Sequence, residues 1–75
     1  MLQRELDALP ARIAQLEQKV AELRVVVNEP EFYRRPHREV QEALDALRDA
    51  EREVEVAVDR WGELEEQAAA AGDAS

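Results

Sequence analysis

Residues 2–27 read LQRELDALPARIAQLEQKVAELRVVV, and an apolar side chain recurs there at alternating spacings of four and three residues. The series consists of Leu2, Leu6, Leu9, Ile13, Leu16, Val20, Leu23 and Val27. This heptad pattern is typical of a helix that packs along a coiled-coil seam. Pro10 interrupts it, because proline lacks a backbone donor and favours the first turn of a helix. We therefore expect a short helical lead-in over residues 1–9 and a first long helix over about residues 10–28.

The second half of the chain repeats the pattern more loosely. Its apolar series is Val40, Leu44, Leu47, Val54, Val58 and Trp61, with the carboxylate of Glu51 in one predicted core position. We expect a second helix over about residues 36–67 and a frayed tail over residues 68–75. Ala43, Ala50, Ala57 and Leu64 then fall on one flank of the second helix.

The segment between the two series predicts a sharp reversal of the chain. Asn28 suits the end of a helix, Pro30 blocks its continuation, and Pro36 suits the first turn of a new one. A tip over residues 29–35 would let the second helix fold back on the first. The sequence therefore predicts an all-α fold, a two-helix antiparallel coiled-coil hairpin formed within one chain.

When the hairpin is folded so that Val27 meets Val40, Leu6 lies against Trp61. In this register each core position a of the heptad on one helix faces a core position d on the other. The predicted core is Leu6, Leu9, Ile13, Leu16, Val20, Leu23, Val27, Val40, Leu44, Leu47, Val54, Val58 and Trp61. Glu51 then lies against Leu16. Two interpretations of Glu51 are open: it leans toward Lys19 or Arg12 and stays partly wet, or it is a polar residue that sets the register.

The composition restricts the function. The chain has 75 residues, 37% of them charged and 4% aromatic, which is little material for an enzyme core. No Cys is present, Lys19 is the sole lysine, and Ser75 is the sole serine, so neither a P-loop nor a nucleophilic triad can be assembled. We expect no catalytic residue, no metal site and no cofactor in this segment. It contains no membrane-length apolar run and no signal-peptide pattern, so we expect a cytoplasmic location.

The charge is distributed unevenly. The net charge is -8, and residues 40–67 account for most of it, with three positive and ten negative side chains. The basic and aromatic residues of the tip are Tyr33, Arg34, Arg35, His37 and Arg38. Such a group suits phosphate contact and base stacking. The alternative is structural: Phe32 caps the coiled coil and the arginines pair with Glu29, Glu31 and Glu39.

Three stretches point to a known family: QRELDALPARI at residues 3–13, EPEFYRR at residues 29–35 and RWGELE at residues 60–65. Together they resemble the C-terminal coiled-coil extension of Uup-type ABC-F ATPases, over roughly residues 3–67. The resemblance implies a piece of a cytoplasmic, non-transporting ATPase. Its two nucleotide-binding cassettes, with ATP and Mg, would precede residue 1.

The resemblance also implies nucleic-acid partners, DNA for Uup-like proteins and ribosomal RNA for ABC-F proteins broadly. It predicts weak, salt-dependent contact through the tip and the first helix, since the second helix is acidic. The alternatives are a protein-interaction hairpin that docks on the parent cassettes in cis, or a ribosome-contacting element. We expect a monomeric hairpin, although heptads alone leave an intermolecular coiled coil open.

Overall fold

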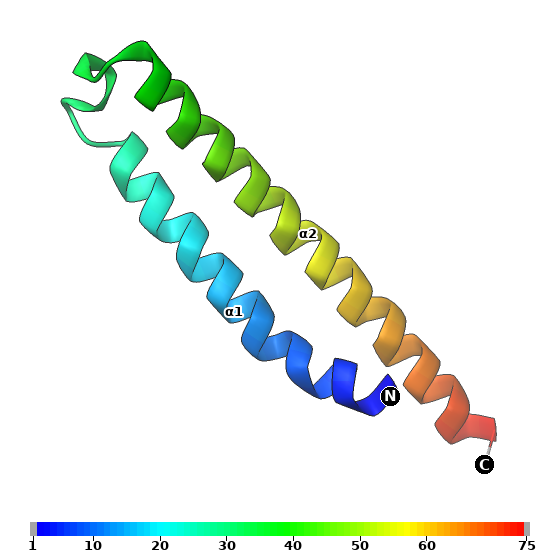
Figure 1. Cartoon of the computed structure of the whole chain (residues 1–75). Helices are drawn as coiled ribbons and strands as arrows, with labels where there is room; N and C mark the ends of the chain where they lie inside the picture. Colours follow the sequence, from blue (N-terminus) through cyan, green and yellow to red (C-terminus); the bar gives the residue numbers. More distant parts are fainter. Residues whose placement is uncertain (1, 75) are drawn as a thin grey trace.

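The computed structural model describes residues 2–74, with side chains over residues 3–72, as two long helices joined by a short turn (Figure 1). Helix α1 covers Leu2–Val27, the 3-10 helix η1 covers Phe32–Arg34, and α2 covers His37–Ala74. The helices run antiparallel in a rod with principal extents of 60 × 16 × 15 Å. This arrangement confirms the predicted all-α hairpin.

Backbone hydrogen bonds show how the chain reverses at the tip. After α1 ends, the amide of Asn28 donates to the carbonyl of Arg24 at 3.0 Å. The amide of Phe32 then donates to the carbonyl of Glu29 at 3.0 Å, and the amide of Arg34 donates to the carbonyl of Glu31 at 3.0 Å, which starts η1. The carbonyl of Pro36 accepts the first bonds of α2, because proline is already set in a helical φ and has no amide to satisfy. The predicted roles of the tip prolines therefore agree with the observed turn.

The helix limits differ from the predicted ones at both ends. Helix α1 begins at Leu2 and continues through Pro10, whereas the sequence suggested a main helix from about residue 10. The residues predicted as a frayed tail are helical as far as Ala74, and Ser75 lies outside the described residues. The run of alanines from residue 68 to residue 71 explains this extension, since alanine has the highest helix propensity.

The apolar core follows α1 as predicted but departs from the prediction on α2. The buried residues are Ile13, Leu16, Val20, Phe32, Val40, Ala50, Ala57 and Leu64. The predicted core residues that are half-buried are Leu6, Leu9, Leu23, Val27, Leu44, Leu47 and Val54. Val58 and Trp61 were placed in the core wrongly, because their side chains are 42% and 36% exposed.

For Val58 the cause is the position of the α2 seam, whereas Trp61 falls in the same heptad series as Val40, Leu47 and Val54. Ala50, Ala57 and Leu64, which the sequence placed on a flank, are 1%, 9% and 0% exposed and take the second core position of each heptad. Ile13 and Leu16 pack against Ala57. Large apolar residues of α1, such as Ile13 and Leu16, thus meet a small residue of α2 at Ala57. Of the residues predicted at this heptad position, which come one residue later, Glu51 and Val58 are exposed and Leu44 is half-buried.

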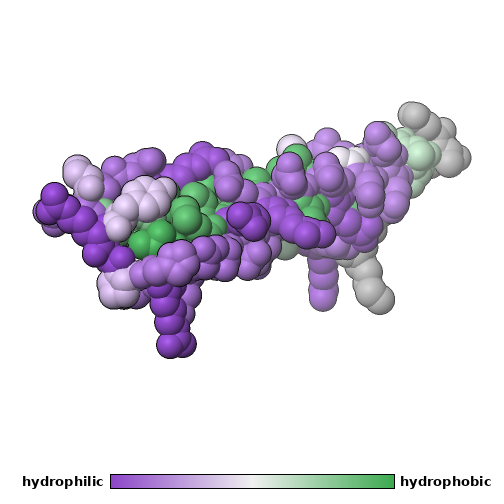
Figure 2. Space-filling model, turned by 90° about the horizontal axis from the view of Figure 1, so that it is seen from above, coloured by the Kyte–Doolittle hydropathy of each residue, from purple (hydrophilic) through white to green (hydrophobic). Residues whose placement is uncertain are grey.

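The surface reflects this narrow core. Figure 2 shows apolar side chains in limited patches bordered by hydrophilic ones, with the largest patch near the tip end. Neither helix, over its described length, is long and apolar enough to cross a membrane.

Candidate nucleic-acid interface

Phe32 anchors the tip on which the predicted contact residues lie. Its side chain is 0% exposed, and its ring meets that of Tyr33 edge-on with 5.0 Å between centroids. The guanidinium carbon of Arg35 lies 5.9 Å from the Phe32 centroid, within the range of a cation–π contact. Burial of this one large ring fixes the turn. The structural interpretation, in which Phe32 caps the coiled coil, therefore agrees with the structure.

The other tip residues point to solvent. Tyr33 is 70% exposed, and the side chains of Arg34 and Arg38 are 82% and 90% exposed. His37, in the first turn of α2, is also exposed. The chain reversal brings all five predicted contact residues to one end of the rod. Arg35 differs from the rest, because its 45% exposed side chain lies over Phe32.

Each tip arginine has a carboxylate nearby. Arg35 lies 3.6 Å from Glu29, and Arg34 lies 3.7 Å from Glu31. Arg38 lies 3.2 Å from Glu42, one helical turn along α2, and not beside Glu39 as the structural interpretation expected. Exposed ion pairs of this kind contribute about 0 to 1 kcal/mol each. The guanidinium groups therefore remain available to a phosphate, although the carboxylates offset their charge.

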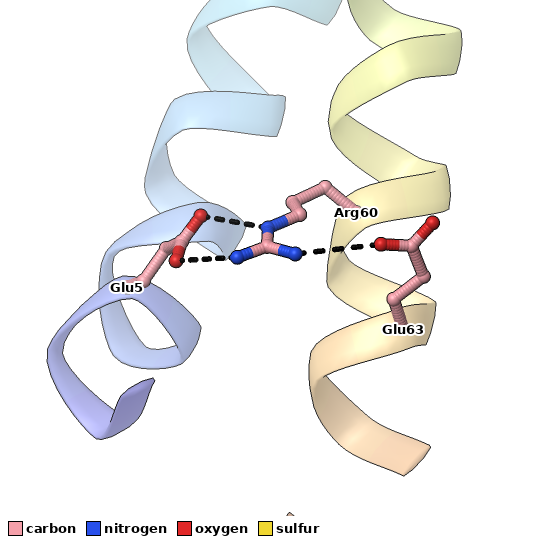
Figure 3. Close-up of polar contacts among 3 residues, drawn as sticks. All are labelled: Glu5, Arg60 and Glu63. Atoms are coloured by element: carbon pink, nitrogen blue, oxygen red, sulfur yellow. Dashed lines mark hydrogen bonds and ion pairs between the residues drawn. The ribbon is translucent and has the colours of Figure 1, made fainter. Parts of the chain in front are cut away.

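The opposite end of the hairpin holds a tighter polar contact that the sequence did not predict (Figure 3). Arg60 donates from Nε to Glu5 Oε1 at 2.9 Å and from Nη2 to Glu5 Oε2 at 3.0 Å. Its Nη1 donates to Glu63 at 3.4 Å. The hydrogen bonds from Arg60 lower the pKa of Glu5, and those to Glu5 raise the pKa of Arg60. A bidentate guanidinium–carboxylate pair has a defined geometry as well as charge attraction.

Three ion pairs join the helices within the described residues, and the two on one flank show that the helices run antiparallel. Glu5 pairs with Arg60, and Arg12, seven residues further along α1, lies 3.8 Å from Glu53, seven residues back along α2. Equal steps in opposite directions are the signature of an antiparallel pair. Sequence reasoning missed these contacts because it placed the α2 seam one residue too late at every second core position.

Glu51 shows the same displacement. Its carboxylate lies 2.8 Å from Arg24 and is 46% exposed, so it is an exposed flank residue. The sequence proposed Lys19 or Arg12 as its partner. No group of three or more potential metal ligands occurs within the described part of the chain.

Comparison with known proteins identifies the hairpin. Residues 1–66 match the family model described as the ABC transporter C-terminal domain. The chain is 42% identical over 65 residues to the "ATP-binding protein Uup-like" and to the "ATP-binding protein Uup" of Haemophilus influenzae. It is 41% identical over 64 residues to the "ATP-binding protein Uup" of Escherichia coli K12. No solved structure matches the chain.

These matches cover 85% to 87% of the chain but 10% to 14% of the relatives. The chain therefore corresponds to a small part of each of those proteins. In this chain, the residues that match the family model contain the heptad seam and the proline-flanked tip described above. The chain belongs to the ABC transporter C-terminal domain family and is a C-terminal domain of the Uup type, within the ABC-F group.

Proposed function

We propose that this domain supplies nucleic-acid contact to a Uup-like ATP-binding protein through the end of the hairpin. Arg34 and Arg38 would contact phosphates and Tyr33 would stack on a base, with His37 beside them. Arg35 would act mainly by holding Phe32. The observation that carries the proposal is the exposure of Tyr33, Arg34 and Arg38 on a turn that a buried ring keeps in shape.

The charge distribution supports approach by the tip. Residues 40–67 have a balance of seven negative charges, while residues 1–27 and 28–39 are each balanced. A phosphate backbone is repelled by the side of α2 and meets less repulsion at the tip and along α1. To bind a phosphate, each arginine must give up its exposed ion pair with a carboxylate. The affinity is therefore expected to be modest and steeply dependent on salt.

The proposal extends to the longer protein. The relatives are called ATP-binding proteins, which supports a parent that binds ATP with Mg in its cassettes and works in the cytoplasm. In this proposal the hairpin contributes no catalytic group and holds no cofactor. Its part is to place nucleic acid, DNA or ribosomal RNA, relative to those cassettes.

Fluorescence anisotropy with labelled duplex DNA, branched DNA and a ribosomal RNA hairpin tests the tip. The double variant Arg34→Gln/Arg38→Gln should weaken binding about tenfold at low salt and reduce the salt slope by roughly two. Arg48→Gln/Arg52→Gln is the matched control, because it removes the same charge from exposed positions of α2. Equal losses in both variants, or no binding at low salt, would contradict tip contact.

A second candidate is protein docking by α2. Glu55 and Asp59 are exposed, whereas Glu63 is engaged by Arg60. Glu55 and Asp59 are therefore more available than Glu63 to contact a basic surface of the parent cassettes. Glu55→Lys/Asp59→Lys should weaken association with separately expressed cassettes and leave tip binding to DNA no weaker. Unchanged association would remove this candidate.

A further inference from the structure

The first eight residues of α1, residues 2–9, are held to the rest of the helix by fewer backbone hydrogen bonds than an uninterrupted helix provides. Pro10 has no amide hydrogen, so the carbonyl of Leu6 lacks the usual bond from four residues ahead, and the proline ring crowds that carbonyl. An isolated helix of this length is not stable in water. Residues 2–9 therefore depend on contacts with α2.

The polar part of those contacts is the Glu5–Arg60 pair. Among the described residues, it is the one ion pair that joins α2 to the part of α1 before Pro10. Arg12–Glu53 and Arg24–Glu51 both lie beyond the proline. The apolar contribution of this segment is partial, because Leu6 and Leu9 are half-buried. Figure 3 shows the guanidinium of Arg60 reaching from α2 to the first turns of α1.

The segment covers an apolar surface of α2. Leu64 is 0% exposed and lies one helical turn beyond Arg60. Because the helices are antiparallel and Glu5 pairs with Arg60, the first turns of α1 are the part of the hairpin nearest to Leu64. Trp61, next to Arg60, is 36% exposed and so is partly covered in the same region. Removal of residues 2–9 would expose both side chains.

We propose that residues 2–9 form a strap, hinged at Pro10 and latched by the Glu5–Arg60 pair, which opens as a unit and uncovers Leu64 and Trp61. Opening leaves Pro10 as the first residue of a shortened helix, the position that proline favours. The contacts of Ile13 and Leu16 with Ala57 lie beyond the hinge and stay intact, whereas Leu9, which packs against this cluster, leaves it. The hairpin thus has a closed and an open form that share the core beyond Pro10.

Amide hydrogen exchange of the whole chain tests the strap. Glu5→Gln should speed exchange over residues 3–13 roughly three- to tenfold, since loss of the latch raises the open population. Residues 11–13 are included because their amides lose their carbonyl acceptors when the strap opens. From Ala14 to Val27 exchange should stay within about twofold of the unmodified chain. Glu53→Gln, which removes an ion pair beyond the hinge, is the matched control and should not affect residues 3–9.

Two further measurements test the hinge and the uncovered surface. Adding Pro10→Ala to Glu5→Gln restores an amide that can bond the Leu6 carbonyl, so exchange over residues 3–9 should slow. Trp61 is the sole tryptophan, and its quenching by acrylamide should rise in Glu5→Gln but not in Glu53→Gln. The strap is refuted if α1 exchanges faster along its whole length, if neither region changes, or if both glutamine variants behave alike. Faster exchange after Pro10→Ala would also refute it.

Discussion

Glu5 and Arg60 illustrate how single residues set the alignment of the two helices. Both are about half exposed, at 45% and 43% of their side-chain surface, so each charge remains hydrated while the two bonds form. A pair of this kind adds less stability than burial of an apolar side chain. Its fixed fork geometry nevertheless favours one register over its neighbours. Phe32 has a comparable role at the tip, through burial of its ring.

The lowered pKa of Glu5 predicts a pH-dependent contribution to stability. Because Arg60 holds the folded-state pKa of this carboxyl below its unfolded value, the contribution is fully present above the unfolded pKa. It is lost as the pH falls through the folded pKa. Thermal unfolding should therefore show a higher Tm for the unmodified chain than for Glu5→Gln at pH 7, with the gap closing in acid. Glu17→Gln makes the same substitution at another exposed position of α1 and is the matched control, and its Tm at pH 7 should fall less than that of Glu5→Gln.

At the scale of the elements, the decisive feature is the alanine series of α2. Two heptad series on α2 share Val40, Leu47, Val54 and Trp61 and differ in the second core position of each repeat. One series offers Leu44, Glu51 and Val58, and the other offers Ala43, Ala50, Ala57 and Leu64. Periodicity fits both. The large apolar residues of α1 leave space for only small side chains opposite them. The alanine series is therefore the one that is buried.

Enlarging one of these alanines tests the seam. Ala50 is 1% exposed, so Ala50→Leu should force the helices apart or strain their side chains. The expected loss is about 1 to 3 kcal/mol in the free energy of unfolding, measured by urea denaturation. Ala21→Leu, at an exposed position of α1, is the matched control, because alanine and leucine have similar helix propensities. A loss in the control as large as in Ala50→Leu would contradict the observed seam.

At the scale of the whole molecule, the hairpin is a narrow rod with its charges segregated. The acidic face belongs to α2, and the tip carries exposed arginines with loose partners. The Cα radius of gyration is 17.3 Å, which reflects the length of the rod and not a large core. Because the core is only one seam wide, we expect binding partners to contact the ends and the exposed faces of the rod.

Small-angle X-ray scattering tests whether one chain folds back on itself in solution. A monomeric hairpin should have a maximum dimension near the 60 Å extent of the rod, with the mass of a single chain. A chain opened into one continuous helix for an intermolecular coiled coil would be about 110 Å long. A dimension near that value together with a doubled mass would overturn the monomer. Measurements at several concentrations separate this outcome from weak association of intact hairpins.

The sequence by itself determined the helical class, the reversal at the tip and the seam of α1. These features depend on local chemistry: heptad spacing, the position of the prolines and the side-chain propensities of nearby residues. It also located the exposed tip residues, because they lie within a few positions of one another.

Only the tertiary structure decided which face of α2 is buried and which residues pair across the helices. Ala50, Ala57 and Leu64 lie inward because of what faces them on α1, and helix periodicity alone does not contain that information. The partners of Glu5 and Glu51 follow from the same choice, since a shift by one residue turns a helix by about 100°. The helix through Pro10 has a similar origin, because α2 offers residues 2–9 contacts that the short segment lacks in isolation.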